Sequence, residues 1–506
     1  MVKLLSKTRF NPRSNDQIIM LTEDYESIDF ASQKWIEQLK RYISTHKLQV
    51  ARLKELKRYY LGDNNIKYRP DKTDEFAADN RISSDFAKYI TIFEQGYMLG
   101  NPVKYTNEDK TLQELIDAFS EQTNEAYHNI LIKTDLSIYG RAYELLNPEE
   151  DENGNVVLKL YHLAPEQTFV IYDDTYQQKS LLGVNYYEVD YGSGHRKMVV
   201  RVYSDDMIYT YVDDNQDNFG LRLVDEPVQH FLKGVPINEF KNNEDRTGAY
   251  ESVLDDIDAY DLSQSELANF QQNSNDAILL ITGNPYTGSD DNDYLEDGRV
   301  NPNGRLGVAI GFKKAQIAVL DDNPNPGGSQ PDAKYLVKEY DSAGAEAYKQ
   351  RLVNDILRFT FTPDILDNNF SGIQSGESMK YKLMASDNYR SKQENLFKKG
   401  LMRRLRLAVN IWKVKGNEAT NYQAINKTVV IFSPNLPQND AEIANIAKSL
   451  FGVVSDQTVY ELLEQVTGID AEDEMERLKS EEPQEPKPRF DVEVNADDEE
   501  NSEEAR

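Results

Sequence analysis

The chain has 506 residues, of which 39% are hydrophobic, and its 87 acidic and 57 basic residues give a formal net charge of −30. This length allows about three core-bearing units, and so acidic a chain is not expected to bind nucleic acid through its overall field. The absence of cysteine excludes disulfides and thiolate ligands, and because no signal peptide and no run of about 18 apolar residues occurs, we expect no membrane association.

The first third of the chain predicts an arm followed by helices. Residues 1–30 show no hydrophobic periodicity and are expected to form a loose arm. From Ser32 onward apolar residues recur at helical spacing, and glycines follow the predicted helix ends at Gly62, Gly100 and Gly140. The predicted helices cover 32–43, 53–60, 83–99, 112–119 and 125–139, with a short strand at 103–105.

After Gly140 the hydrophobic pattern changes from helical spacing to the spacing of strands. The predicted strands cover 142–146, 156–163, 168–172, 181–191, 197–203 and 207–212. A turn at Glu152-Asn-Gly-Asn155 is typical of a hairpin between the first two. The section is therefore expected to be β-rich.

An acidic helix and an insertion come next. The helix is predicted at about 248–272, and its carboxylates include Glu251, Asp255, Asp258 and Asp261. The insertion, 276–332, contains short predicted strands at 277–281, 306–310 and 316–320 between exposed loops. One loop carries Asp290, Asp291, Asp293 and Tyr294. This loop lacks the glycine and the final glutamate of an EF-hand calcium loop, which favours a solvated contact loop over a metal site.

The longest predicted helix covers 377–415. It follows a strand at 334–340, a helix at 343–359 and a loop at 362–374. Phe397, Leu401 and Leu405 begin a buried stripe along it, and 39 residues would span about 58 Å. So long a helix needs an extended surface to lie against.

This long helix is basic, with 11 Lys/Arg against 3 Asp/Glu. The cluster consists of Lys398, Lys399, Arg403, Arg404 and Arg406. One interpretation is a nucleic-acid-binding stripe. We favour the other: the helix lies beside the acidic helix, within a subunit or between subunits, and pairs with it and with other neighbours.

The C-terminal part predicts a strand at 428–432 and helices at 440–450 and 455–467. From Ser480 to Arg506 there are 11 acids, 3 bases and three prolines. This composition is typical of a disordered tail.

The sequence contains no compact catalytic motif. The five histidines have no zinc-site spacing, and there is no P-loop, dinucleotide fingerprint or nucleophile elbow. We therefore expect no enzymatic activity, no cofactor and no metal, with the histidines acting as packing or surface residues.

Several segments resemble one family. The run Val-Pro-Ile-Asn-Glu-Phe-Lys-Asn-Asn at 235–243, and the helix after it, resemble the segment that enters the stem helix in portal proteins of tailed double-stranded-DNA phages, most closely the siphophages of Gram-positive hosts. Asn80-Arg81, 97–102 and 135–144 resemble the wing segments of that family. The order of elements agrees over about 30–480.

The resemblance implies an α+β, multi-domain portal fold that forms a ring, usually of twelve copies. Its parts would be an arm (1–30), a helical then β-rich wing (31–247), a stem helix (248–275), a clip (276–332), a strand with a second stem helix (333–361), a tunnel loop (362–376), a long wing helix (377–416), a crown (417–481) and a disordered acidic tail (482–506). The tunnel loop would face DNA with Asp364, Ile365, Asp367, Asn368, Asn369, Phe370 and Ser371. The acidic stem would repel the passing phosphates.

The implied function is a non-enzymatic channel at one capsid vertex of the virion, assembled in the host cytoplasm, for DNA packaging and ejection. The implied partners are the terminase large subunit, a head-completion or adaptor protein docked at the clip, the major capsid and scaffolding proteins, and double-stranded DNA bound without sequence specificity. Two other classes remain open: a minor structural or scaffold protein without a channel, docking an acidic partner through its basic helix, and a metal-dependent enzyme.

Overall fold

The computed structural model describes residues 9–11, 14–72, 78–190, 192, 196–213, 220–274, 278–282, 290–315, 332–336, 341–364, 376–414, 422–434 and 440–480. The chain divides into two compact units, which are described separately below. The first comprises Met1–Gly372 and Tyr381–Asn435, and the second comprises Ile373–Lys380 and Leu436–Arg506. The mixture of helices and sheets confirms the predicted α+β class.

The opening of the first unit is helical as predicted, but it has four long helices where five were predicted, because the runs at 32–43 and 53–60 form one helix. It contains α3 (Gln33–Tyr60), η1 (Asn65–Tyr68), α4 (Phe86–Leu99), α5 (Lys110–Gln122) and α6 (Glu125–Tyr139). Ser32 caps the start of α3 by accepting a hydrogen bond from Trp35 N. Gly140 ends α6 with a φ of 80°, and a Cβ there would clash with the backbone of Arg246.

Two sheets follow. The larger has the order β1–β5–β6–β7–β8–β10, with β9 paired to β8, and the smaller has the order β11–β3–β4. Their strands are β3 (Arg141–Glu150), β4 (Val156–Leu163), β5 (Thr168–Tyr172), β6 (Ser180–Asp190), β7 (Arg196–Tyr203), β8 (Met207–Asp213), β9 (Leu221–Leu223), β10 (Val228–Gln229) and β11 (Ile237–Lys241). The last three were not predicted, because they are short and lack a clear alternation.

The expectation of a loose arm over 1–30 needs a correction. Within its described residues, β1 (Ile18–Ile19) pairs in parallel with β5, and α2 (Thr22–Glu26) follows. Ile18 and Met20 are buried among residues of α3 and the large sheet. The segment is thus an edge strand, too short to show periodicity in the sequence.

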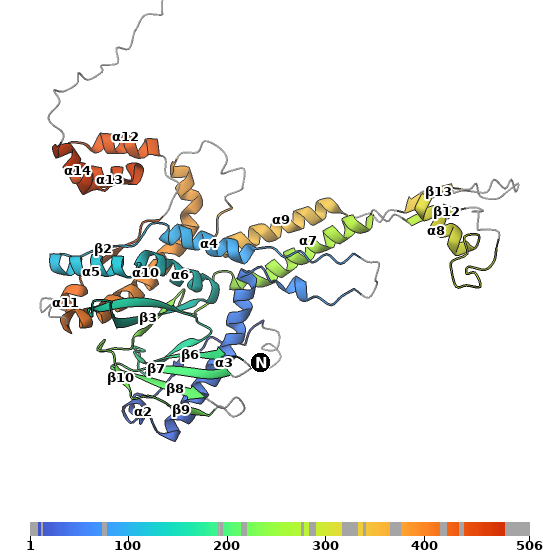
Figure 1. The fold of residues 1–506 in the computed structure, drawn as a ribbon. Helices are drawn as coiled ribbons and strands as arrows, with labels where there is room; N and C mark the ends of the chain where they lie inside the picture. The colour runs from blue at the N-terminus through green and yellow to red at the C-terminus, as the bar shows by residue number, and fades with distance from the viewer. Residues whose placement is uncertain are drawn as a thin grey trace, which may run out of the picture. The chain divides into compact units, whose positions relative to one another are not determined.

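Two helices of the first unit lie side by side, α7 (Leu254–Ser274), preceded by η2 (Glu251–Val253), and α9 (Ser342–Phe359) (Figure 1). Beyond their ends β12 (Ile278–Thr282) pairs with β13 (Asp332–Leu336). Between these strands, 305–315 is the helix α8 (Arg305–Ala315), so the strand predicted at 306–310 is wrong. The side chain of Asp293 accepts a hydrogen bond from Leu306 N and stabilises the start of this helix.

The long helix α10 (Gly376–Val414) confirms the prediction within one residue at each end. Phe397, Leu401 and Leu405 are fully buried in a core shared with α5, α6 and β3. After α11 (Tyr422–Ile425), β14 (Val429–Ile431) pairs with β2 (Lys104–Thr106). Residues up to 435 therefore belong to the first unit, although the expected crown begins at 417.

In the second unit, α12 (Asp440–Leu450) contacts α13 (Asp456–Thr467), which contacts α14 (Ala471–Ser480). The last helix was not predicted. Residues 481–506, which carry nearly all of the predicted acidic tail, lie outside the described part of the chain, as does the strand predicted at 316–320. None of the described helices is both long and apolar enough to cross a membrane.

Candidate functional site

The predicted acidic residues of α7 and η2 do not form one common exposed surface. Glu251 binds Arg52, which is 3% exposed, and accepts a hydrogen bond from Gly248 N at 3.0 Å. Asp258 forms an ion pair with Arg9 at 3.0 Å. Asp255, with a side chain that is 88% exposed, also pairs with Arg9, at 2.8 Å. Much of this helix's predicted charge is therefore neutralised by the N-terminal segment and α3.

Asp261 is buried against the loop before α4. Its two oxygens accept hydrogen bonds from Asn64 Nδ2 at 2.6 Å and from Ser84 N at 2.9 Å. Burial raises the pKa of Asp261 to about 6, against the opposing effect of these hydrogen bonds. The carboxylate thus links α7 to the loop through hydrogen bonds, and Asp261 is 0% exposed.

Two other carboxylates, Asp256 of α7 and Asp355 of α9, lie near each other where the two helices pack. Within the described residues, neither forms an ion pair or a hydrogen bond through its side chain. Burial raises the pKa of Asp256, and the negative charges of Asp355 and Asp255 raise it further. Sequence reasoning did not select this pair, because only the packing of α7 on α9 brings the two helices together.

The basic cluster of α10 divides between the interior and the surface: Lys399 and Arg406 are exposed, and Lys398 and Arg403 are half-buried. Arg404 is 0% exposed. Its guanidinium donates to both oxygens of Glu144 at 2.5 to 3.1 Å, to Glu125, and to Asn129 Oδ1 at 2.9 Å. Burial opposes the charge of Glu144, but Arg404 and His128 outweigh it and hold the pKa of Glu144 at about 2.

The other basic residues of the cluster have separate roles. Arg403 donates to Ile237 O and Val235 O, and Arg406 donates to Asn426 Oδ1 at 2.8 Å. Lys399 pairs with Glu244 at 3.7 Å, and Lys398 is half-buried. A nucleic-acid stripe is therefore wrong for Arg404, which faces the interior, whereas Arg403 lines a hollow and is held there by backbone carbonyls.

The predicted pairing of α10 with α7 inside one subunit is also wrong. The described ion pairs of α10 join it to α6, to β3, to the loop after β11 and to residues of its own. Those of α7 and η2 go to Arg9, Arg52, Arg69 and Lys72. The net charges of α7 and α10 have opposite signs, but this does not bring the two helices together within one chain. Charged residues of other elements already pair with each helix. Pairing of the two helices between subunits stays a prediction.

Of the predicted tunnel loop residues, only Asp364 is described; Ile365, Asp367, Asn368, Asn369, Phe370 and Ser371 lie outside the described residues. The segment just before them is held against α10. Ser386 Oγ donates to Phe361 O at 2.6 Å, and the Phe361 ring stacks on Tyr389 with centroids 4.9 Å apart. Phe361 has a φ of 57°, a conformation that these contacts support.

The four predicted clip residues separate into two kinds. Asp290 and Asp293 are engaged internally, Asp290 with Asn301 Nδ2 at 3.0 Å and Asp293 with α8. Asp291 is exposed, and Tyr294 is 60% exposed. Asp290 is exposed as well, but its carboxylate is engaged by Asn301, so Asp291 and Tyr294 are the exposed pair without such a bond in the described part of the chain.

The described residues contain no group of three or more His, Asp or Glu placed to hold a metal ion. Four of the five histidines are described, and they contact neighbours: His128 binds Glu144 at 3.0 Å and His162 binds Asp135 at 2.7 Å. His46 contacts Tyr186, and burial lowers its pKa to about 3. These are packing roles, as expected for them; His195 lies outside the described residues.

Comparison with known proteins gives the following. The family model described as phage portal protein, SPP1 Gp6-like, matches residues 39–487. The portal protein of Bacillus phage SPP1 is 26% identical over 241 residues, which are 42% of this chain and 46% of that protein, so the match spans about half of each. A chain from the virion of a native gene transfer agent particle is 13% identical, with 81% of this chain and 92% of that chain covered and a TM-score of 0.37. A chain from the neck of an empty gene transfer agent particle is 14% identical, with 81% and 93% covered and a TM-score of 0.38. TM-scores of this size carry no argument of their own.

Proposed function

The chain belongs to the SPP1 Gp6-like family of phage portal proteins, and we propose that its copies form a ring around a DNA channel at one vertex of a phage capsid. The observation that carries the proposal is the family match, which spans 39–487 of the 506 residues. It confirms the resemblance seen in the sequence. The ring is the passage for DNA during packaging and ejection, and it performs no chemistry itself.

We assign the parts of the ring as the resemblance implies. The α7–α9 pair is the stem, 276–332 is the clip, and α10 crosses the wing. Docking of a head-completion protein at the clip would use Asp291 and Tyr294, since these side chains are exposed. The terminase large subunit, the capsid protein and a scaffolding protein are the further partners, and assembly takes place in the host cytoplasm.

An uncompensated negative charge on the stem supports the idea of a lining that DNA does not adhere to. Twelve copies of a −30 chain would carry about −360 in total. Because Glu251, Asp258 and Asp261 are bound by neighbours, the repulsion of phosphate falls to Asp256 and Asp355 in this proposal.

The alternative of a channel-less scaffold that docks an acidic partner through α10 loses support. Arg404 and Arg403, at the centre of its proposed docking surface, are committed to partners in the interior of the chain.

Electron microscopy of the purified full-length protein, with native mass, tests the ring. Rings of about a dozen copies around an open channel are the expected result. A monodisperse monomer or dimer over a range of salt concentrations would overturn the proposal and revive the scaffold alternative.

The lining is tested separately by reversing both stem charges, Asp256→Lys with Asp355→Lys, in assembled particles. We expect slower DNA ejection, because cationic rings retain phosphate. The control is Glu37→Lys on the exposed face of α3. Unchanged packaging and ejection in the double variant would refute the acidic lining while leaving the ring intact.

A further inference from the structure

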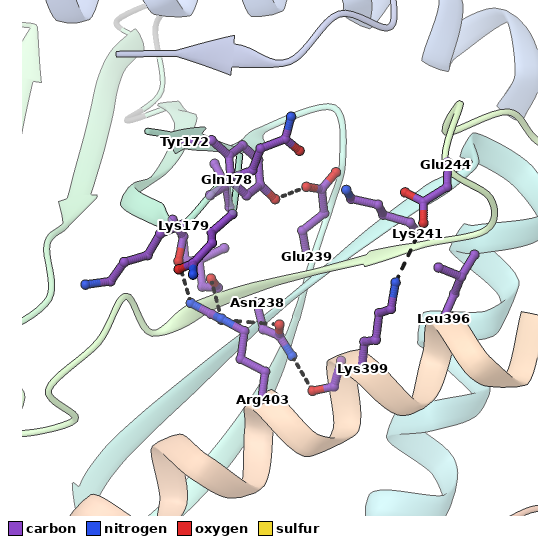
Figure 2. A pocket seen from close by; sticks show the side chains of 15 residues that line it. Tyr172, Gln178, Lys179, Asn238, Glu239, Lys241, Glu244, Leu396, Lys399 and Arg403 are labelled. Carbon is purple, nitrogen blue, oxygen red and sulfur yellow. Dashed lines mark hydrogen bonds and ion pairs between the residues drawn. The ribbon is translucent and has the colours of Figure 1, made fainter. Parts of the chain in front are cut away.

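A cationic hollow of about 330 Å³ lies where α10 passes β11 and the turn between β5 and β6 (Figure 2). Four bases line it: Lys179, Lys241, Lys399 and Arg403. Its lining contains two carboxylates, Glu239 and Glu244. In a chain with 30 more acids than bases, a hollow with twice as many bases as acids is an unusual local reversal.

Arg403 gives this hollow a fixed positive charge. Its guanidinium donates to two backbone carbonyls, to Asn238 Oδ1 at 3.2 Å and to Ser180 Oγ at 2.9 Å. All four acceptors are uncharged, and within the described residues Arg403 has no ion-pair partner. Burial lowers its pKa, which shows that the surroundings do not fully stabilise the charge.

The two carboxylates of the hollow are already engaged. Glu239 binds Arg246 at 2.7 Å and accepts a hydrogen bond from Tyr172, and Glu244 pairs with Lys399. Figure 2 shows the hydrogen bond from the Tyr172 hydroxyl to Glu239 and the ion pair between the Lys399 ammonium and Glu244. Neither carboxylate is left to neutralise a further base.

Two ammonium groups, those of Lys179 and Lys241, therefore lack a partner among the described residues. Lys179 is exposed at the rim, whereas Lys241 is half-buried. Burial lowers the pKa of Lys241, and the neighbouring charges of Arg246 and Lys399 lower it further, despite Glu239 and Glu244. A carboxylate beside the Lys241 ammonium would stabilise its charged form.

We propose that the hollow binds a carboxylate side chain from a second copy of this chain. The inference rests on the proposed ring, which places copies side by side. Phosphate sites usually offer an arginine fork or unpaired backbone N–H groups, but here Arg403 is occupied, and the N–H groups of Gln178 and Lys179 bind Thr175 O and Asp173. What remains is the half-buried ammonium of Lys241 and, at the rim, the exposed ammonium of Lys179, and a carboxylate can neutralise either one. Carboxylates are also what each copy has in excess.

The same hollow explains how copies of so acidic a chain can associate. Neighbours at −30 each repel one another, so a ring needs points where a base of one copy meets an acid of the next. A partly desolvated ammonium gives a stronger and less salt-sensitive attraction than an exposed one.

The test uses zero-length cross-linking with a carbodiimide, which joins an ammonium to a carboxylate only when the two are in contact. Rings are assembled from equal amounts of ¹⁴N- and ¹⁵N-labelled full-length protein, verified by native mass, cross-linked and analysed by peptide mass spectrometry. We expect mixed-isotope cross-links from Lys179 or Lys241 to acidic peptides. We expect none from Lys392, an exposed lysine of α10 that does not line the hollow.

A charge series separates this role from simple folding effects. Lys179→Gln with Lys241→Gln should lower the salt concentration at which rings dissociate by at least twofold. The matching pair of Arg substitutions should retain ring stability while abolishing the cross-links, because guanidinium does not react, and Lys392→Gln should change neither. Circular dichroism establishes that each variant is folded.

Three results would overturn the proposal. The first is cross-links from these lysines that stay within one isotope. The second is a thermal shift with inorganic phosphate that depends on both lysines, without cross-links between copies; this would assign a small-anion site instead. The third is rings of the double Gln variant with unchanged salt resistance. If wild-type protein forms no rings in the native-mass step, the proposed function itself fails, before the cross-linking is read.

Discussion

Replacing Arg404 by methionine tests whether the buried charge cluster holds α10 in the first unit. The substitution preserves much of the side-chain volume but removes the cation shared by Glu144 and Glu125. Both carboxylates are at most 4% exposed and would be left without it. Breaking a buried ion pair in this way costs about 3 to 5 kcal/mol.

The pKa of Glu144 gives an independent estimate. In the variant this carboxyl can escape its unpaired charge by taking up a proton, which from an ordinary value of 4.5 costs about 3.4 kcal/mol at pH 7. At pH 5 the same protonation costs about 0.7 kcal/mol. The penalty of Arg404→Met should therefore shrink by about 2 to 3 kcal/mol between pH 7 and pH 5.

The wild-type contribution of Glu144 does not change over that range. Its pKa is lowered to about 2, so its stabilisation is fully present above about pH 4.5 and is lost only as the pH falls toward 2. If the difference in unfolding free energy between wild type and Arg404→Met becomes smaller from pH 7 to pH 5, the change therefore comes from the variant. The two effects can be separated by measuring both proteins at each pH.

The assay is thermal unfolding of the full-length protein at equal protein concentration. For Arg404→Met we expect a Tm about 5 to 10 °C lower at pH 7. The control is Arg406→Met on the same helix, whose exposed hydrogen bond to Asn426 is worth no more than about 0.5 kcal/mol. Equal Tm values for the two variants at pH 7, or a gap unchanged at pH 5, would refute the reasoning.

Three further variants test other parts of the first unit. Gly400→Ala would place a Cβ within the ring of Phe240, and it should lower the free energy of unfolding by about 1 to 3 kcal/mol in denaturant titration. Asp256→Asn with Asp355→Asn should raise the free energy of unfolding slightly at pH 7, by less than about 1 kcal/mol, and the gain should vanish as the pH falls toward 4, because the raised pKa of Asp256 disfavours only its charged form. A gain that persists at pH 4 would contradict this. Asp293→Ala removes the hydrogen bond to the start of α8 and should speed amide exchange over 305–315 about fivefold, while exchange in 86–99 stays constant.

The long elements were predictable because their periodicity records burial directly. The stripe of α10 from Phe397 to Trp412 is buried as expected, and β4, β5, α6 and α12 have the bounds that the sequence predicted. Each of these segments contributes enough apolar residues to one side for its period to be read. Gly140 and Ser32 also marked helix ends in the sequence. Gly140 adopts the left-handed conformation that ends α6, and the Ser32 side chain caps the start of α3.

Short elements failed for the opposite reason. β1 consists of two residues, and its pairing with β5 is a contact across more than 150 positions that no local pattern encodes. In α8, Leu306, Val308 and Ile310 alternate as in a strand, but Asp293 and the carbonyl of Gly304, which accepts from Val308 N, start a helix. A hydrogen bond from a preceding loop overrode the hydrophobic pattern.

The charged residues show the limit of reading a site from composition. The long helix has a large excess of bases, yet Arg404 is bound by Glu144 and Glu125 and Arg403 by backbone carbonyls. Lys392, Lys399, Arg406 and Lys413 of the same helix are exposed, so the count of bases alone does not tell which of them a partner can reach. The acidic helix is neutralised in the same way, partly by Arg9, which lies about 250 positions earlier in the chain.

The charged side chains that can bind a partner are those that form no ion pair within the chain. On the α7–α9 pair, which we propose as the stem, this unpaired remainder is negative, at Asp256 and Asp355, and in the hollow beside α10 it is positive, at Lys179 and Lys241. A ring of such copies would present the negative remainder to DNA, where repulsion serves passage. It would present the positive remainder to the neighbouring copy, where attraction serves assembly. DNA passage needs unpaired negative charge and assembly needs unpaired positive charge. A single chain can supply both only if its internal ion pairs leave carboxylates unpaired on α7 and α9 and ammonium groups unpaired in the hollow.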